Sequence, residues 1–295
     1  MPNPIQRRLR TVDVFTAVPF KGNPVAVIFD ADEIDSATMQ ALARWTNLSE
    51  TTFVCKPTSP QADYRLRIFT PAQELPFAGH PTLGSARAIL ESGLTPKTPG
   101  ELIQECGRGN VRVRIDGDRL FFALPSPRFA DPSDSMRDTL IRSLGIESDE
   151  IVAASVIDVG PVWATVAIRD ATRVVALEPR YDLMLPLSKQ GIVGVNVFAR
   201  TASSSGTPYD VEVRSFVPGE GIAEDPVCGS GNGCVAALIQ RERLLTTSTY
   251  VAGQGQCVGR EGRIFVSFDA DVIWIGGHAV TVVHGEIAVN AGAVE

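Results

Sequence analysis

The stretch that decides the fold is residues 222–240, IAEDPVCGSGNGCVAALIQ. It begins with an acidic pair, Glu224 and Asp225, continues through alternating glycines and ends in the uncharged run 234–239. Apolar side chains on every face of that run predict a helix enclosed by the protein. Glycines let a backbone approach a ligand closely, and the first N–H groups of a helix have no partner within it. We therefore expect the start of this helix to bind a small anion, most simply a carboxylate.

An earlier stretch has the same pattern. RIFTP at residues 67–71 is followed by Glu74, by AGHPT at residues 78–82 and by a nearly uncharged run. RSFVP at residues 214–218 stands in the same position before the later stretch. This similarity predicts an internal repeat of roughly 150 residues, and hence two similar halves with two helix starts available to face one ligand.

Size and composition indicate a globular protein of two domains. The chain has 295 residues, of which 44% are hydrophobic and 21% are charged. Its net charge of −7 argues against nucleic acid or an anionic membrane surface as the main partner. No uncharged apolar run reaches the roughly 18 residues that span a bilayer. The N-terminus also lacks the apolar segment of a signal peptide, so we expect a cytoplasmic protein.

The cysteines and histidines do not predict a metal site. The five cysteines include no Cys-x-x-Cys pair, and the three histidines are not at ligand spacing. An odd number of cysteines likewise argues against a disulfide framework.

Alternating patterns predict the order of the elements. In the first half, strands are expected at residues 12–14, 25–29, 51–55 and 64–69. Asp35 or Ser36 can cap a helix after the second strand, and Asp116-Gly117 favours a hairpin turn. The proline- and serine-rich residues 125–133 are the predicted linker.

The second half is predicted to repeat this order. Its strands are expected at residues 151–159, 162–168, 193–199, 211–216, 255–258, 264–268, 272–275 and 280–289. A helix is expected at residues 183–191 and a flexible surface loop at residues 203–208.

Glu50 is the first candidate for chemistry. It lies between a predicted helix end and a strand, beside Leu48, Thr52 and Phe53. A poorly solvated carboxylate there would have a raised pKa and would suit general acid/base catalysis. The alternative is a solvated glutamate in a loop.

His80 and Asp225 are the next candidates. His80 follows Gly79 at the start of the first buried helix, where it can donate to a substrate oxygen or simply cap backbone groups. Asp225 precedes a proline, which favours an extended backbone. It can bind a substrate amine or orient His80, and the alternative is an aspartate that caps its loop.

The predicted anion cradle consists of Ser230 and the backbone amides of Gly229 and Gly231. A P-loop is excluded because no Gly-Lys-Ser/Thr follows, and the glycine spacing does not match the dinucleotide fingerprint. Cys228 lies beside the same helix start, where a thiol has a lowered pKa and can act as a base. Cys234, inside the apolar run, is interpreted as core packing.

Several ordered motifs resemble one known family. They are DVFT at residues 13–16, GNP at 22–24, NLSETTF at 47–53, FAGHPT at 77–82 and EDPVxGS at 224–230. Together they look like the PhzF family of phenazine-biosynthesis isomerases, within the diaminopimelate epimerase superfamily. The resemblance runs from about residue 11 to the C-terminus.

The resemblance implies an α/β (α+β) fold of two pseudo-symmetric lobes, each a bent sheet wrapped around a central helix. The lobes would comprise residues 1–127 and 128–282, with a C-terminal strand near residues 283–293 completing the first. It also implies a cleft active site, a homodimer and no metal, flavin or pyridoxal phosphate.

By position, the resemblance implies a role for each candidate residue. Glu50 would be the proton-transferring acid/base, with His80, Asp225 and Ser230 binding or orienting a small carboxylate substrate. The glycine amides at both helix starts, including Gly79, would hold the carboxylate.

Epimerases of the superfamily carry a cysteine in each half, whereas this chain has Ala78 at the first position and Cys228 at the second. Inverting a stereocentre requires acid and base on opposite faces, so an isomerase that moves a double bond is favoured. Cys228 stands where the phenazine enzymes commonly have threonine. The alternatives are a pyridoxal-phosphate-independent amino-acid epimerase or racemase using Cys228, and a non-catalytic metabolite-binding protein.

Overall fold

The computed structural model describes residues 5–202, 206–220 and 222–289. It divides into two compact units. The first comprises Met1–Ala123 and Gly276–Glu295, and the second comprises Leu124–Ile275. The division predicted from the sequence lies near residue 127, with a C-terminal strand completing the first lobe.

The first unit contains two α-helices, α1 (Ser36–Thr46) and α2 (Gly79–Glu91). Its strands are β1 (Ile5–Val14), β2 (Asn23–Ile28), β3 (Glu50–Cys55), β4 (Tyr64–Phe69), β5 (Glu74–Leu75), β6 (Glu101–Cys106), β7 (Gly109–Asp116), β8 (Arg119–Ala123) and the later part of β17 (Val272–Val289). Asp35 caps α1 by accepting a hydrogen bond from the amide of Thr38, as predicted.

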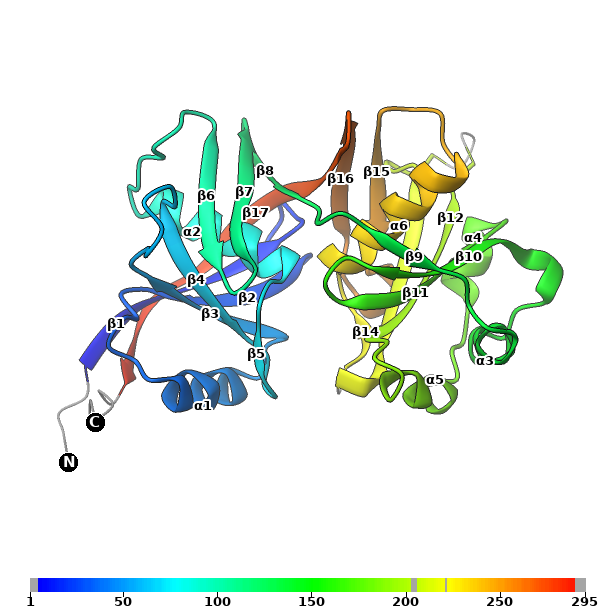
Figure 1. Ribbon diagram of the computed structural model, residues 1–295, viewed down its shortest axis with the longest axis horizontal. Coiled ribbons are helices and arrows are strands. Elements are labelled where there is room, and N and C mark those ends of the chain that lie inside the picture. The colour runs from blue at the N-terminus through cyan, green and yellow to red at the C-terminus, as the bar shows by residue number, and fades with distance from the viewer. Residues whose placement is uncertain (1–4, 203–205, 221, 290–295) are drawn as a thin grey trace. The chain divides into compact units, whose positions relative to one another are not determined.

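The sheet of the first unit closes around α2 (Figure 1). β1 pairs with β2, β2 runs parallel to β3, β3 pairs with β4, and β4 runs parallel to β6. The sheet continues through β7 and β8 to β17, which returns to β1. Helices α1 and α2 are the two crossovers that the parallel pairs require. The enclosed helix α2 is buried from Gly79 to Ala86.

The second unit contains α3 (Asp134–Leu144), α4 (Ala171–Ala176), α5 (Tyr181–Ser188) and α6 (Gly229–Glu242). Its strands are β9 (Arg128–Ala130), β10 (Ile151–Asp158), β11 (Val162–Ile168), β12 (Gly194–Arg200), β13 (Val211–Val217), β14 (Ile222–Asp225), β15 (Thr249–Gln254), β16 (Gly262–Asp269) and the start of β17. Short 3₁₀ turns lie at Ser148–Glu150, Pro218–Glu220 and Gln256–Val258.

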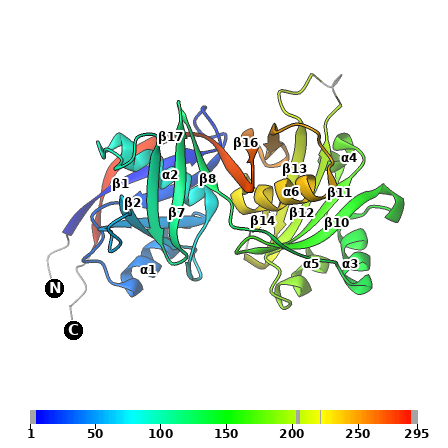
Figure 2. The same cartoon turned by 45° about the horizontal axis from the view of Figure 1, so that its top comes forward.

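The second unit repeats the pairing pattern of the first. β11 runs parallel to β12 and β13 runs parallel to β15, with β14 added to β13 as β5 is to β4. The strands β10, β12 and β13 lie around α6 (Figure 2), whose first two turns and middle are buried. The predicted mixed α/β fold of two similar lobes, each with a bent sheet around a central helix, is confirmed.

Glycine allows helix and sheet to approach closely in the first unit. A Cβ atom added at Gly84 would lie 2.3 Å from Cγ1 of Val25 and 3.0 Å from Cγ2 of Val14. Helix α2 therefore rests directly on β1 and β2, which fixes the position of its first turn.

Several predicted boundaries were wrong. The predicted linker contains β9, which is exposed and exists only because it pairs with β10. The strand expected at residues 255–258 is a 3₁₀ turn, and the strand lies earlier, in β15. Residues 272–289 form one strand, because Gly276 marks a close approach to the carbonyl oxygen of Leu120 rather than a break. The expected loop at residues 203–208 lies partly outside the described residues, and helix α3 had not been predicted.

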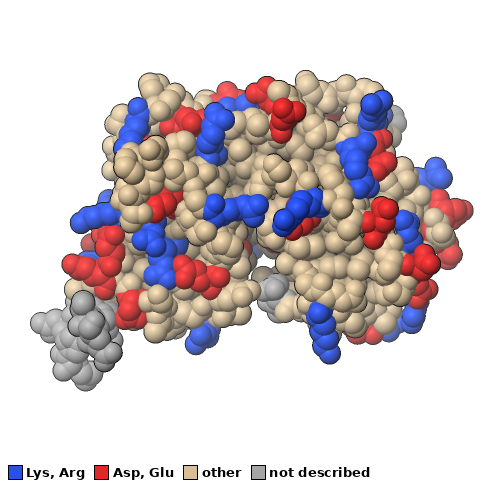
Figure 3. Space-filling model, in the orientation of Figure 1, with Lys and Arg blue, Asp and Glu red and all other residues tan. Residues whose placement is uncertain are grey.

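Charged side chains of both signs intermingle over the face of the molecule in Figure 3. Among the described residues, no helix has the length and apolarity needed to cross a membrane.

Candidate active site

Glu50 and His80 come together in the first unit. Glu50 is the first residue of β3, beginning just after Asn47 ends α1 in a left-handed conformation, and it pairs with Val25 of β2. His80 lies in the first turn of α2. The Nε2 atom of His80 is 3.4 Å from Oε2 of Glu50, and both side chains are largely buried, with exposed fractions of 5% and 14%. Two residues 30 positions apart in sequence are thus neighbours in the fold.

The charge state of His80 follows from its surroundings. Burial lowers its pKa to about 3, although a hydrogen bond to the backbone of Pro24 acts in the opposite direction. Nε2 makes no hydrogen bond, so the bond to the carbonyl of Pro24 uses Nδ1–H. A neutral imidazole with its proton on Nδ1 presents the lone pair of Nε2 to Glu50. In this arrangement Nε2 of His80 can accept a hydrogen bond from a protonated carboxyl group.

The loop that supplies the Pro24 carbonyl is itself fixed. The amide of Gly22 donates to Oδ2 of the buried Asp13 at 3.1 Å. A Cβ atom at Gly22 would lie 2.1 Å from the carbonyl oxygen of Val14, so only glycine fits there. Ser49 donates to Oδ1 of Asn23 at 3.2 Å, which ties this loop to the residue before Glu50. The DVFT, GNP and NLSETTF motifs therefore support a single pair of side chains.

Asp225 ends β14 in the second unit. Its carboxylate accepts a hydrogen bond from the amide of Val227 at 3.0 Å. Burial raises the pKa of this half-buried carboxyl group to about 6, while hydrogen bonds from Cys228 and Val227 partly oppose the shift. Asp225 can therefore exchange a proton near neutral pH.

Cys228 caps helix α6. Its sulfur accepts a hydrogen bond from the amide of Gly231 at 3.2 Å and lies 3.6 Å from Oγ of Ser230. Ser230 also accepts a hydrogen bond from Nε1 of Trp163 at 3.2 Å. A Cβ atom at Gly231 would lie 2.6 Å from Oδ1 of Asn196, so the backbone is tightly enclosed. The Gly231 amide, predicted to cradle an anion, donates to the Cys228 sulfur, whereas Gly229 begins the helix beside it.

Two buried glutamines, which no pattern in the sequence had predicted, hold the helix starts in place. Gln254 of β15 accepts from the amide of Cys228 at 3.1 Å and from Nδ2 of Asn232 at 2.7 Å. It also donates to the carbonyl oxygen of Asp225 at 3.0 Å. Asn232 in turn donates to the carbonyl oxygen of Cys228 at 2.9 Å. This network fixes the backbone of the whole loop from Asp225 to Cys228.

The first unit has the same brace. Gln104 of β6 donates to Oγ1 of Thr82 at 3.0 Å, and Thr82 donates to the carbonyl oxygen of Ala78 at 2.8 Å. Ala78 and the buried Gly79 occupy the helix start that Cys228 and Gly229 occupy in the second unit. The signal in the sequence was a glutamine at the same distance after each glycine-containing loop, at positions 104 and 254.

The candidates fall into two groups, one in each unit. Glu50, His80 and Gly79 belong to the first unit, and the others belong to the second: Asp225, Cys228, Gly229, Ser230 and Gly231. Cys234 is fully buried inside α6, as predicted for core packing. The described residues contain no group of three or more His, Cys, Asp or Glu side chains arranged to hold a metal ion.

Comparison with known proteins gives the same family across most of the chain. The family model described as "Phenazine biosynthesis-like protein" matches residues 12–285. Antisense-enhancing sequence 1 of Schizosaccharomyces pombe is 39% identical over 296 residues, covering 95% of this chain and 98% of that protein. Trans-2,3-dihydro-3-hydroxyanthranilate isomerase of Pseudomonas aeruginosa is 33% identical over 267 residues, covering 88% of this chain and 89% of that enzyme.

A solved structure shows the same fold. The PhzF-family phenazine biosynthesis protein of Bacillus anthracis superposes with a TM-score of 0.82 at 24% identity, covering 96% of this chain and 99% of that one. The matches in sequence and fold agree with the motifs that surround Glu50, His80 and Asp225. The chain therefore belongs to the phenazine biosynthesis-like (PhzF) family.

Proposed function

We propose that this protein is a cofactor-independent isomerase that moves a double bond in a small unsaturated carboxylate by proton transfer through Glu50. The observation that supports this proposal most directly is the buried pair of Glu50 and His80. Nε2 of the neutral ring lies 3.4 Å from the carboxyl oxygen. The relatives named trans-2,3-dihydro-3-hydroxyanthranilate isomerase support the reaction class.

The proposed reaction requires only a proton transfer within one molecule. The Glu50 carboxylate removes a proton from one carbon, and the electron pair of that C–H bond moves into the adjacent conjugated system. The protonated Glu50 then returns the proton to a second carbon on the same face. No atom is gained or lost, and one C–H bond breaks as another forms. Such a transfer is within the reach of one positioned acid/base group.

His80 has a positioning and proton-holding role in this proposal. Its Nδ1–H is engaged by Pro24, so only Nε2 is directed at Glu50. A neutral Nε2 can accept a hydrogen bond from protonated Glu50 without adding a charge to the site. This holds the acid in one orientation between the two proton transfers.

The groups of the second unit are proposed to bind the substrate. Asp225, with a pKa of about 6, suits a substrate amine, and Ser230 with the amide of Gly229 suits a carboxylate. The equivalent helix start in the first unit carries Ala78, which has no exchangeable side-chain proton. A single thiol at Cys228 therefore favours the isomerase over a two-thiol epimerase.

Solvent-deuterium incorporation during turnover tests the role of Glu50. With trans-2,3-dihydro-3-hydroxyanthranilate in D₂O, the wild-type protein is expected to incorporate deuterium into the product, and Glu50→Gln is expected to lower turnover by about 10²-fold or more. Deuterium incorporation that persists in the Glu50→Gln variant would show that Glu50 does not transfer the proton.

Cys228→Ser separates the isomerase from an epimerase. Serine can also accept the hydrogen bond from Gly231, so turnover of the unsaturated carboxylate should be retained in the Cys228→Ser variant. Optical rotation that changes when wild-type protein acts on an amino acid, and is lost in Cys228→Ser, would instead show an epimerase.

A further inference from the structure

The register of the strands gives the pair of Glu50 and His80 a counterpart in the second unit. Glu50 faces Val25 across the parallel strands β2 and β3. At the corresponding position of the parallel strands β11 and β12, Gly194 faces Trp163. Gly194 therefore occupies the position in the second unit that the acid/base candidate occupies in the first, and it has no side chain.

Two further positions agree with this equivalence. The phenylalanine of the repeated Arg-x-Phe motif, Phe69 in one unit and Phe216 in the other, pairs with the residue that directly follows this position. His80 is the second residue of α2, and Ser230 is the second residue of α6. Ser230 is thus the counterpart of His80, so both members of the pair have an equivalent in the second unit.

The indole ring of Trp163 occupies the space that a side chain at position 194 would need. A Cβ atom added at Gly194 would lie 2.8 Å from Cζ3 of the ring. Trp163 is only 2% exposed, and its Nε1–H group donates to Oγ of Ser230 at 3.2 Å. In the first unit a carboxyl group lies beside the second residue of the central helix, whereas in the second unit an N–H donor does.

Trp163 determines how the hydroxyl group of Ser230 can bond. The indole N–H is a donor only, so Oγ of Ser230 accepts from it and keeps its own proton to donate. The sulfur of Cys228 lies 3.6 Å from Oγ, but sulfur is a weak acceptor, and it already accepts from the amide of Gly231. A negatively charged ligand oxygen is a stronger acceptor for this proton.

We propose that Trp163 is a positioning residue for the substrate carboxylate, because it orients Ser230 so that the hydroxyl group donates to a carboxylate oxygen. This inference rests on the proposed function, in which Ser230 binds the carboxylate. It adds a preference at this position, since an ammonium group has no lone pair to receive the serine proton. Trp163 acts through Ser230 and transfers no proton itself.

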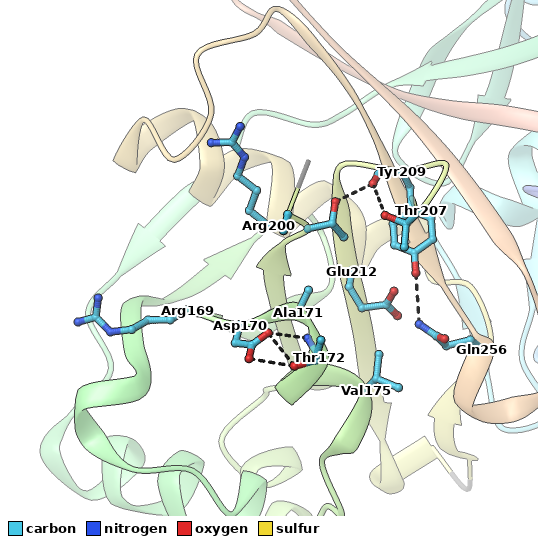
Figure 4. Close-up of a pocket in the computed structure, with 12 residues that line it drawn as sticks. Arg169, Asp170, Ala171, Thr172, Val175, Arg200, Thr207, Tyr209, Glu212 and Gln256 are labelled. Carbon is cyan, nitrogen blue, oxygen red and sulfur yellow. Dashed lines mark hydrogen bonds between the residues drawn. The ribbon is translucent and has the colours of Figure 1, made fainter. Parts of the chain in front are cut away.

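A pocket elsewhere on the second unit is the competing site for a carboxylate. It has a volume of about 680 Å³ and lies at the end of β12 and beyond the end of β11, whereas Gly194 and Trp163 lie at the start of those strands. Arg169 and Arg200 line it and are exposed (Figure 4). A test of the Ser230 site therefore needs a variant of this pocket as well.

Calorimetry with anthranilate, an unsaturated ring that bears a carboxylate, tests the proposal. Anthranilate should bind the full-length wild-type protein. Ser230→Ala should weaken this binding by about tenfold, because a charge-assisted hydrogen bond is lost. Trp163→Phe keeps a ring against Gly194 but lacks the N–H group, and it should weaken binding by about fivefold. The double variant should bind as Ser230→Ala does, because Trp163 acts through Ser230.

Two control variants should leave the affinity for anthranilate unchanged. Trp45→Phe makes the same substitution at a side chain that is 77% exposed, and Arg200→Gln removes a positive charge from the competing pocket. The proposal would be overturned if wild type did not bind anthranilate, if Trp163→Phe bound it as wild type does, or if the two losses multiplied in the double variant. Binding that is lost in Arg200→Gln and retained in Ser230→Ala would place anthranilate in the pocket and refute the proposal.

NMR of the indole N–H groups guards against a folding defect in Trp163→Phe. The chain has three tryptophans, so the signal that is missing from this variant identifies Nε1–H of Trp163. In wild type, anthranilate should shift that signal, and aniline, which lacks the carboxylate, should not. Ser230→Ala should abolish the shift. An equal shift with aniline, or a shift that survives in Ser230→Ala, would contradict the positioning role.

None of these measurements uses turnover, so the two proposals can fail separately. A protein that binds anthranilate through Ser230 and Trp163 but incorporates no deuterium would refute the isomerase and leave the role of Trp163 intact. A protein that incorporates deuterium through Glu50 but binds anthranilate equally well in Trp163→Phe would refute the role of Trp163 alone.

Discussion

At the scale of single residues, burial controls the protonation of the candidate site more than charged neighbours do. Burial is the largest cause of the lowered pKa of His80 and of the raised pKa of Asp225. Burial disfavours the charged form of each side chain, so both His80 and Asp225 are more often uncharged than they would be in water. His80 is therefore neutral near pH 7, and Asp225 keeps its proton up to a higher pH than an exposed aspartate does.

Asp225 should make stability depend on pH. Its pKa of about 6 in the folded protein lies above the value near 3.9 of an unfolded aspartate. Between about pH 4 and pH 6 the folded state binds more protons than the unfolded state, so the free energy of unfolding falls as pH rises through this window. The wild-type free energy of unfolding should fall by an amount on the order of 2–3 kcal/mol across this window. In the Asp225→Asn variant this fall should be absent. Urea unfolding of both proteins from pH 4 to pH 7.5 measures it, and parallel curves would contradict the expectation.

The sequence pointed to Glu50 and His80 as candidates but not to the buried residues that hold the helix starts. Glu50 and His80 were found because each follows a recognisable helix signal and motif. Gln104 and Gln254 were missed, since a glutamine in a short strand looks like any solvated residue until its burial is known.

At the scale of elements, the two central helices are held in the same way. A buried glutamine on the strand after each helix reaches a polar residue in its second turn, Thr82 in α2 and Asn232 in α6. That residue bonds back to the carbonyl oxygen at the start of the helix. The repeat therefore extends from the order of the elements to individual hydrogen bonds, although the side chains at the helix starts differ.

Removing the glutamine brace should loosen the loop that carries Asp225. Gln254→Leu leaves two donors and a carbonyl oxygen without their partner, at a cost of about 3 kcal/mol or more. Chemical denaturation should show this loss together with a fall in turnover. Gln254→Glu keeps the accepting oxygens but lacks the donor to Asp225, so it should lose less stability. Equal stability of Gln254→Leu and wild type would mean that the brace is not structural.

The contact between α2 and its sheet should tolerate no added methyl group. Gly84→Ala places a Cβ atom against Val25 and Val14 and should lower the free energy of unfolding by about 1–3 kcal/mol. Gly285→Ala is the matched control, because nothing lies within 4 Å of its Cβ position. Thermal unfolding of the two variants measures the difference, and similar melting temperatures would show that α2 can shift away from the sheet.

At the scale of the whole molecule, the first unit is built from two segments that lie far apart in the sequence. The first unit is completed by the later part of β17, which pairs with β1 from Ile5 to Val14 and with β8. Without this strand the closed sheet would have two open edges and α2 would lose part of its cover. Exposed edges of this kind favour aggregation.

Truncation tests this dependence. A chain that ends at Ile275 should lose the cooperative unfolding of the first unit and expose α2 to proteases, because both neighbours of β17 become edges. Limited proteolysis with mass spectrometry, compared with the full chain, measures this. A truncated protein that protects residues 79–91 as well as the full chain does would show that the first unit folds without β17.

The sequence by itself determined the repeat, the two buried helices, the capping of α1, most strands and the family to which the chain belongs. These features depend on local spacing, such as alternation along a strand or a glycine before an apolar run. Only the tertiary structure decided the neutral state of His80, the raised pKa of Asp225, the hydrogen bonds of Gln254 and the pairing of β9 with β10. Burial and strand pairing depend on residues distant in the chain, and no local pattern encodes which of them become neighbours.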